Sequence, residues 1–244
     1  MLVIAHRGAS GWAPENTIPA FQKAVELGAD MIEFDIQFSA DRHIVVFHDK
    51  TVDRTTNGTG RISEKTLADL RQLDAGAWFD PHYAGTRIPT LREALSTVSG
   101  SVQLNIELKY FDPENDLFEQ DVAAIATEFD LLSRAIFAAR HPENIRRLKE
   151  LLPGIKCVLL QKERTEDEYV EALRDLDLTI AQIRRRSMNQ AFIDRLHDHQ
   201  IKVNLFYADE PDEMKEFIDM GIDGILTNYP DRLCQVIREL AQPG

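Results

Sequence analysis

Cysteine is scarce in this sequence, whose 244 residues include only Cys157 and Cys234. Two cysteines provide neither a disulfide framework nor a zinc site, so we expect two packed thiols. Long apolar runs are missing too, since no stretch approaches the roughly 20 apolar residues of a membrane helix. The apolar run at residues 2–5 is too short for a signal peptide and lacks a basic start. We therefore expect a cytoplasmic protein without membrane insertion.

Positive charge is also scarce. The sequence has 28 Lys and Arg residues against 41 Asp and Glu residues, which gives a net charge of −13. Such a chain repels phosphate backbones and anionic lipid surfaces, so nucleic acid is not an expected partner. A small anionic ligand would need a pocket made locally positive by Arg, Lys or a metal ion. With 43% apolar residues, the chain has an ordinary globular composition.

Short apolar runs alternate with longer helical patterns along the chain. The runs predict strands at 2–5, 31–38, 43–47, 102–108, 135–139, 155–160, 179–183, 202–207 and 224–227. The helical patterns cover 19–27, 121–129, 142–152, 166–173, 190–197, 211–220 and 231–240. Repeated strand–helix units predict a parallel sheet with crossover helices. Eight or so units in this length favour an α/β fold of one domain, a TIM (β/α)8 barrel over residues 1–244.

Residues 51–90 interrupt this alternation. They are polar and rich in Gly and Pro, with a single helical patch at 64–73. We interpret them as a small subdomain inserted into the barrel.

Carboxylates occupy one face of two predicted strands. In 31–38, Glu33 and Asp35 alternate with apolar residues, and Glu107 does the same in 102–108. The apolar face fits packing against helices, which leaves the acids pointing into the barrel. Buried carboxylates need a counter-charge, and three of them with open water positions suit Mg²⁺ or Ca²⁺. The alternative, structural salt bridges to Lys109 or an Arg, remains open.

Two histidines directly follow apolar runs, where a barrel places its catalytic groups. His6 precedes Arg7-Gly8, and His48 precedes Asp49. A lone His is more often structural, but two of them near three inward acids favour acid–base chemistry.

Other polar features carry weaker signals. Arg184–Arg186 is interpreted as a solvated loop, and Gly58-Thr59-Gly60 as a turn. The remaining histidines are expected at the surface or in the core: His43, His82, His141, His197 and His199.

Several motifs, in order, resemble the glycerophosphodiester phosphodiesterase family of bacterial cytoplasmic type. They are His6-Arg7-Gly8, Pro14-Glu15-Asn16-Thr17, Glu33-Phe34-Asp35, His48-Asp49, 53–60, Pro89-Thr90-Leu91, 105–109 and 221–230. The resemblance implies a TIM barrel that hydrolyses small glycerophosphodiesters to sn-glycerol 3-phosphate and an alcohol. The oligomeric state would be a monomer or a homodimer.

The resemblance also implies a role for each matching residue. Glu33, Asp35 and Glu107 would hold one divalent metal ion, Mg²⁺ or alternatively Ca²⁺. His6 and His48 would be the acid–base pair, without either role being fixed. Arg7 and Lys109 would grip the phosphate and Glu15 would support the site. The nucleophile, water or a substrate hydroxyl, stays open.

Two departures from the family pattern concern the substrate's alcohol. Phe206 stands where the family usually has Trp, and Arg140 ends a strand that tends to finish with Ser-Phe. Phe holds a quaternary ammonium less well than Trp, and Arg140 would repel one. We therefore predict a substrate-binding Phe206 and a preference for anionic or hydroxyl-rich alcohols. Alternatively, Arg140 turns to the surface or pairs with Glu163. A lipid phosphodiesterase and a non-catalytic phosphate-binding barrel remain rival functions.

Overall fold

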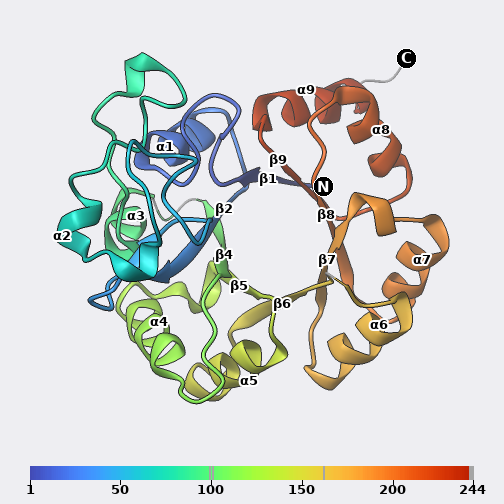
Figure 1. The fold of residues 1–244 in the computed structure, drawn as a ribbon. Helices are drawn as coiled ribbons and strands as arrows, with labels where there is room; N and C mark the ends of the chain where they lie inside the picture. The colour runs from blue at the N-terminus through green and yellow to red at the C-terminus, as the bar shows by residue number, and fades with distance from the viewer. Residues whose placement is uncertain (99, 101, 162, 242–244) are drawn as a thin grey trace.

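A closed ring of parallel strands dominates the computed structural model, which describes residues 1–98, 100, 102–161 and 163–241 (Figure 1). The ring order within these residues is β1 (Leu2–His6), β2 (Met31–Phe38), β4 (Gln103–Leu108), β5 (Ala135–Ala139), β6 (Lys156–Leu160), β7 (Ile180–Arg184), β8 (Lys202–Phe206) and β9 (Gly224–Thr227). The ring closes because β1 pairs with both β2 and β9. The predicted TIM barrel is confirmed.

Helices surround the ring and cover its outer face (Figure 1). They are α1 (Ile18–Glu26), α3 (Leu91–Thr97), α4 (Leu117–Glu128), α5 (Pro142–Leu151), α6 (Glu166–Asp175), α7 (Gln190–Asp198), α8 (Pro211–Asp219) and α9 (Pro230–Leu240). The sequence pattern missed α3, which has only seven residues. Its signal is the capping box in which Thr90 and Glu93 bond each other's backbone N–H groups. Within the described residues, no helix combines the length and apolarity needed to cross a membrane.

The strand β3 (Ile44–Val46) is not part of the ring. It runs antiparallel to the outer half of β2, with Val46 opposite Ile36. The chain therefore turns back toward the barrel after β2, and the backbone N–H of Phe47 bonds the carbonyl of Asp35 over 2.9 Å. His48 follows at once, so the antiparallel return brings it beside the inward face of β2.

Two apolar layers lie on the two sides of the barrel wall. The inner layer fills the barrel interior away from the C-terminal ends of the strands. It consists of Ile4, Met31, Ile136, Ala138, Val158, Leu160 and Leu226. The larger outer layer joins the strands to the helices and includes Phe34, Phe137 and Phe192. Because these side chains fill that part of the interior, space for a ligand remains at the C-terminal ends of the strands.

Residues 51–90 form loops and short helices beside β2 and α3 (Figure 1). The predicted helix at 64–73 is shorter than expected: a 3-10 turn covers Ile62–Glu64, α2 covers Leu67–Leu70, and a second 3-10 turn covers Pro81–Tyr83. A separate buried cluster packs this region, with the members Val45, Phe47, Val52, Ile62, Leu70, Ala75 and Ile88.

Both cysteines carry free thiols, as predicted. Cys157 is buried and Cys234 is partly buried. Burial raises the pKa of the Cys157 thiol to about 12, so the thiol stays neutral at physiological pH.

Candidate active site

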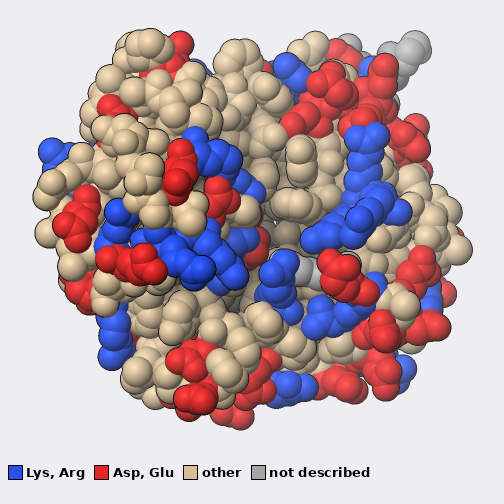
Figure 2. All heavy atoms as spheres, viewed as in Figure 1, with Lys and Arg blue, Asp and Glu red and all other residues tan. Residues whose placement is uncertain are grey.

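A cavity of about 700 Å³ opens at the C-terminal ends of the strands. Figure 2 shows basic side chains gathered around the central hollow of this face. The lining includes the predicted site residues Arg7, His48, Glu107, Lys109 and Phe206. The other predicted site residues are not part of this lining: His6, Glu15, Glu33 and Asp35.

Three carboxylates meet at the base of the cavity, as their alternation in the sequence predicts. Glu33, Asp35 and Glu107 each offer an oxygen within 4.8 Å of the others. Their exposed fractions are only 2%, 1% and 8%. Parallel pairing of β2 with β4 places Asp35 opposite Glu107, which explains the meeting.

Two cations accompany the carboxylates. The Nζ of Lys109 lies 2.7 Å from Glu107 and 3.3 Å from Asp35. The Nε of Arg7 lies 3.5 Å from Asp35, while its Nη1 pairs with Glu15 over 2.7 Å. The salt-bridge alternative is therefore realised in part. It does not balance the charge, because three buried carboxylates face two cations and Arg7 is shared with Glu15.

The ionisation of the trio reflects this imbalance. Burial raises the pKa of Glu33 well above its usual value, and the charges of Asp35 and Glu107 add to the rise. Burial also raises the pKa of Glu107, against the opposing effect of Lys109. For Asp35, burial is outweighed by Lys109, His48 and Arg7, which hold its pKa at about 2. Burial and the repulsion among the three carboxylates therefore oppose full ionisation of the trio, and a bound cation would relieve this repulsion.

A divalent metal ion fits this donor set. Its oxygens belong to carboxylates, the ligands that Mg²⁺ and Ca²⁺ prefer. In the described part of the chain, Asp35 Oδ1 is buried without a hydrogen-bond partner. The other oxygen of Asp35 accepts a hydrogen bond from Asn16 Nδ2 over 2.8 Å, which fixes the carboxylate's orientation. Oriented ligands of this kind are typical of metal sites.

His6 ends β1 and is held by Asn228. Their side chains meet through His6 Nδ1 and Asn228 Oδ1 at 2.8 Å, and Asn228 Nδ2 donates to Asp209 over 2.6 Å. The ring stacks on Tyr207 and meets the edge of Phe206, with centroids 5.3 and 5.2 Å away. Burial, followed by the charge of Arg7, lowers the pKa of His6 to about 4. His6 is therefore neutral at pH 7.

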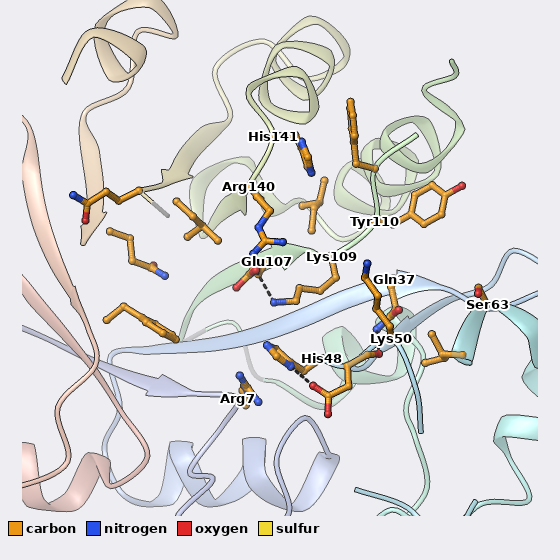
Figure 3. A pocket seen from close by; sticks show the side chains of 18 of the residues that line it. Arg7, Gln37, His48, Lys50, Ser63, Glu107, Lys109, Tyr110, Arg140 and His141 are labelled. Atoms are coloured by element: carbon orange, nitrogen blue, oxygen red, sulfur yellow. Dashed lines mark hydrogen bonds and ion pairs between the residues drawn. The ribbon is translucent and has the colours of Figure 1, made fainter. Parts of the chain in front are cut away.

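His48 is held by its sequence neighbour. Its Nδ1 lies 2.5 Å from Asp49 Oδ1, and the other oxygen of Asp49 accepts from Arg54 Nε over 2.6 Å (Figure 3). Arg54 also makes two hydrogen bonds of 2.7 Å to Glu15, which in turn contacts Arg7. Glu15 thus connects the supports of His48 and Arg7.

The turn after β1 is strained. Arg7 has a φ of 56°, a left-handed conformation that costs energy for a residue with a side chain. This conformation lets its backbone N–H donate to Glu33 Oε2 over 2.8 Å. Gly8 follows with a φ of 83°, and a Cβ there would lie 2.7 Å from Ala20 of α1. Gly8 thus allows the turn and its close packing on the helix.

Several functional contacts were missed from the sequence. Asn16 and Asn228 belong to recognised motifs, but nothing in their pattern shows that they hold Asp35 and His6. Asp209 lies in a loop after β8 and carries no signal at all. His141 is exposed, within the expectation of a surface or core position, but the sequence did not show that it lines the cavity and stacks on Phe111 at 4.3 Å.

The tri-arginine run is not uniformly solvated, so this interpretation was wrong for one member. Arg184 lines the cavity, whereas Arg185 pairs with Glu213 over 2.6 Å and Arg186 is exposed. Arg140, whose direction was left open, also lines the cavity.

The fold and this cavity define a class of protein. It is a (β/α)8-barrel enzyme with an acidic cluster set in an otherwise cationic pocket, which suits phosphate esters. The sequence model of the glycerophosphoryl diester phosphodiesterase family matches residues 6–232. The chain belongs to this family, and it is accordingly an enzyme that hydrolyses glycerophosphodiesters.

Similar proteins span almost the whole chain. The glycerophosphodiester phosphodiesterase of Caldanaerobacter subterraneus subsp. tengcongensis is 36% identical, covering 98% of both chains. The structure of an Oleispira antarctica phosphodiesterase in complex with the product sn-glycerol-3-phosphate superposes with a TM-score of 0.85, 29% identity and 96% coverage of each chain. That of an Agrobacterium tumefaciens glycerophosphodiester phosphodiesterase gives 0.81, 28% identity, and coverage of 95% of this chain and 98% of the other.

Proposed function

We propose that the enzyme releases sn-glycerol 3-phosphate and an alcohol in a metal-dependent reaction with a histidine acid–base pair. The observation that carries this proposal is the meeting of Glu33, Asp35 and Glu107 within 4.8 Å, beside a cationic cavity. The Oleispira antarctica structure, which holds sn-glycerol-3-phosphate as product, supports the identity of the product.

Glu33, Asp35 and Glu107 would hold one divalent ion, Mg²⁺ in preference to Ca²⁺. When bound, the ion polarises the phosphoryl oxygens as a Lewis acid and offsets their negative charge. The trio's geometry needs no rearrangement of the barrel to offer three oxygens.

Arg7 and Lys109 would bind the non-bridging phosphate oxygens. Both line the cavity and both already lie among carboxylates, so their side chains are ordered before substrate arrives. Charge-assisted hydrogen bonds from fixed donors gain strength as charge grows on these oxygens in the transition state.

His6 would act as the base. A carboxylate such as Asp209 only accepts hydrogen bonds, so Asn228 must turn its Nδ2 to Asp209 and its Oδ1 to His6. Asn228 Oδ1 then requires a proton on Nδ1 of the ring. In the neutral ring this leaves Nε2 unprotonated, ready to take the proton of the attacking hydroxyl.

His48 would act as the acid toward the leaving alcohol. Asp49 accepts from Nδ1, which orients the ring and leaves Nε2 as the nitrogen that can give a proton. Asp49 also supplies a negative charge beside the ring while His48 carries a proton. A carboxylate plays the same part beside histidine in hydrolytic triads.

The test is an assay of glycerophosphoglycerol with added Mg²⁺, with product detected by an enzyme specific for sn-glycerol 3-phosphate. The proposal expects one equivalent of this product per bond cleaved. Release of the other stereoisomer, or of the free alcohol's phosphate, would contradict it. Parallel assays with intact phospholipid vesicles separate this function from that of a lipid phosphodiesterase. Such an enzyme would hydrolyse the phospholipid faster than it hydrolyses glycerophosphoglycerol.

A further inference from the structure

The cavity extends beyond the carboxylate trio, to the opposite arc of the barrel. In the ring order, β7 lies across from β2, so the end of β7 faces Glu33 and Asp35 over the mouth. Arg184 ends β7 and Arg140 directly follows β5, and both line the cavity. Figure 3 shows Arg140 reaching from its strand end toward Glu107 and Lys109.

Strand register explains why these two arginines point inward. In β5, Ile136 and Ala138 belong to the inner layer, so Arg140 continues that face. In β7, Gln182 points inward and accepts from Asn105 of β4 over 3.0 Å, so Arg184, two residues later, shares its face. Arg185 lies beyond the end of β7, in a 3-10 turn over Arg185–Ser187, and pairs with Glu213 instead.

The charge of this arc is not neutralised by the protein. The cavity is lined by six Lys or Arg residues and two carboxylates, Asp49 and Glu107. Arg7 and Lys109 are engaged by the site's acids. For Arg140 and Arg184, no carboxylate of the described residues lies within 4.0 Å, the limit for an ion pair. In a chain with a net charge of −13, a cationic arc of this kind implies an anionic occupant.

The neighbouring His141 is consistent with a concentrated positive charge. Burial and then the charges of Arg140 and Arg164 lower the pKa of its ring. The ring also stacks on Phe111, which holds it at the cavity wall. A neutral imidazole there could donate a hydrogen bond to an anionic group without adding charge.

We infer that Arg140 and Arg184 form a second anion-binding subsite that selects glycerophosphodiesters whose alcohol carries another phosphate group. The inference rests on the proposed function: the scissile phosphate occupies the site at Arg7 and Lys109, and the alcohol extends toward β5 and β7. The same subsite disfavours a cationic alcohol such as choline. The second phosphate belongs either to a further phosphodiester link or to a phosphomonoester.

The experiment compares substrates with and without a second phosphate group. Bis(glycerophospho)glycerol is set against glycerophosphoglycerol, and glycerophosphoinositol phosphate against glycerophosphoinositol, which distinguishes the diester source from the monoester source. We expect kcat/KM to be higher for the doubly phosphorylated member of at least one pair. Raising the salt concentration from about 0.05 M to about 0.5 M should shrink the preference, since the contacts are ionic.

Matched variants assign the preference to the arc. Arg140→Gln and Arg184→Gln should each reduce the ratio of kcat/KM values within a pair about five- to tenfold, as loss of a charge-assisted contact does. Arg186→Gln removes the same charge from the same tri-arginine run but not from the cavity, so the ratio should not change. Arg140→Glu should shift preference toward glycerophosphocholine.

Each remaining outcome is decisive. Equal kcat/KM values within both pairs, or ratios unaltered by all cavity variants, would overturn the subsite while leaving the proposed function intact. Failure of the wild type to hydrolyse any of the four substrates would overturn the proposed function, and this inference with it.

Discussion

Asn228 holds His6: its Oδ1 lies 2.8 Å from Nδ1 of the ring, 222 residues away in the sequence. Asp209 orients Asn228 in turn, over 2.6 Å, and Ser10 donates a further hydrogen bond of 2.6 Å to the same Oδ1. The neutral amide orients the imidazole, and although its hydrogen bond raises the pKa of His6, burial and the charge of Arg7 outweigh this effect and keep the pKa low. This suits a base that must be unprotonated at neutral pH.

Replacing the amide with a carboxylate should change this balance. In Asn228→Asp, the new negative charge favours the imidazolium and raises the pKa of His6 from about 4. We expect the acidic limb of the pH profile of kcat/KM to move up by about one unit or more. The control is Asn189→Asp, the same change at the exposed N-cap of α7. Coincident acidic limbs for wild type and Asn228→Asp would refute the role given to Asn228.

Removing either histidine should abolish most of the activity. General acid–base catalysis contributes roughly 10²–10⁴-fold, so His6→Ala and His48→Ala should each lose about this factor in kcat. His199→Ala, at the exposed end of α7, should retain wild-type kcat. Circular dichroism and Tm would verify that all three variants are folded. Near-wild-type turnover in both site variants would remove them from the mechanism.

The carboxylate trio should make the metal-free protein sensitive to pH. The pKa of Glu33 is raised in the folded state, so the folded protein holds a proton that the unfolded chain loses near pH 4.5. In chelator, the stability from this group is present below about pH 4.5 and is lost as pH rises through the folded pKa. Asp35, with a pKa of about 2, has its effect only at lower pH.

Urea unfolding in chelator from pH 4.5 to 8 measures this dependence. Glu33→Gln mimics the protonated acid and can still accept from the N–H of Arg7. The variant should therefore become more stable than the wild type as pH rises, although it loses the metal ligand. Glu150→Gln, on the exposed surface of α5, provides the matched control. A stability difference between Glu33→Gln and wild type that does not change with pH would contradict the assignment.

Gly8 should be needed for packing in addition to backbone conformation. Gly8→Ala and Gly85→Ala both place a Cβ at positive φ, but only Gly8 would clash, with Ala20 at 2.7 Å. We expect Gly85→Ala to cost about 1 kcal/mol from the backbone alone. Gly8→Ala should cost roughly 1–3 kcal/mol more from overpacking. Chemical unfolding measures both, and equal losses would show that the close approach to α1 is unimportant.

Much of the fold follows from periodicity. The alternation of apolar and polar residues in 31–38 and 102–108 predicts that Glu33, Asp35 and Glu107 point into the barrel, because side-chain direction in a strand is a local property. Elements with little periodicity are harder to predict from the sequence. The helix α3 is too short to show a pattern, and nothing local indicates that β3 turns back along β2.

The site's supporting contacts depend on the tertiary fold. Asp209 and Asn228 reach His6 only after β1, β8 and β9 become neighbours. Arg184, Arg185 and Arg186 look alike in sequence, yet the first ends β7 and lines the cavity, whereas the second begins a 3-10 turn and pairs with Glu213. His141 reaches the mouth because β5 ends there. Such assignments require knowing where each strand ends, to within one residue.

The most direct test of the central claim is the response of turnover to exhaustive chelation and to Mg²⁺ added back. The trio Glu33, Asp35 and Glu107 predicts that chelated enzyme is inactive toward glycerophosphoglycerol and that Mg²⁺ restores turnover with one ion per chain. Glu107→Gln should need at least about tenfold more Mg²⁺ for half-maximal activity. Full turnover after complete removal of divalent ions would contradict the account.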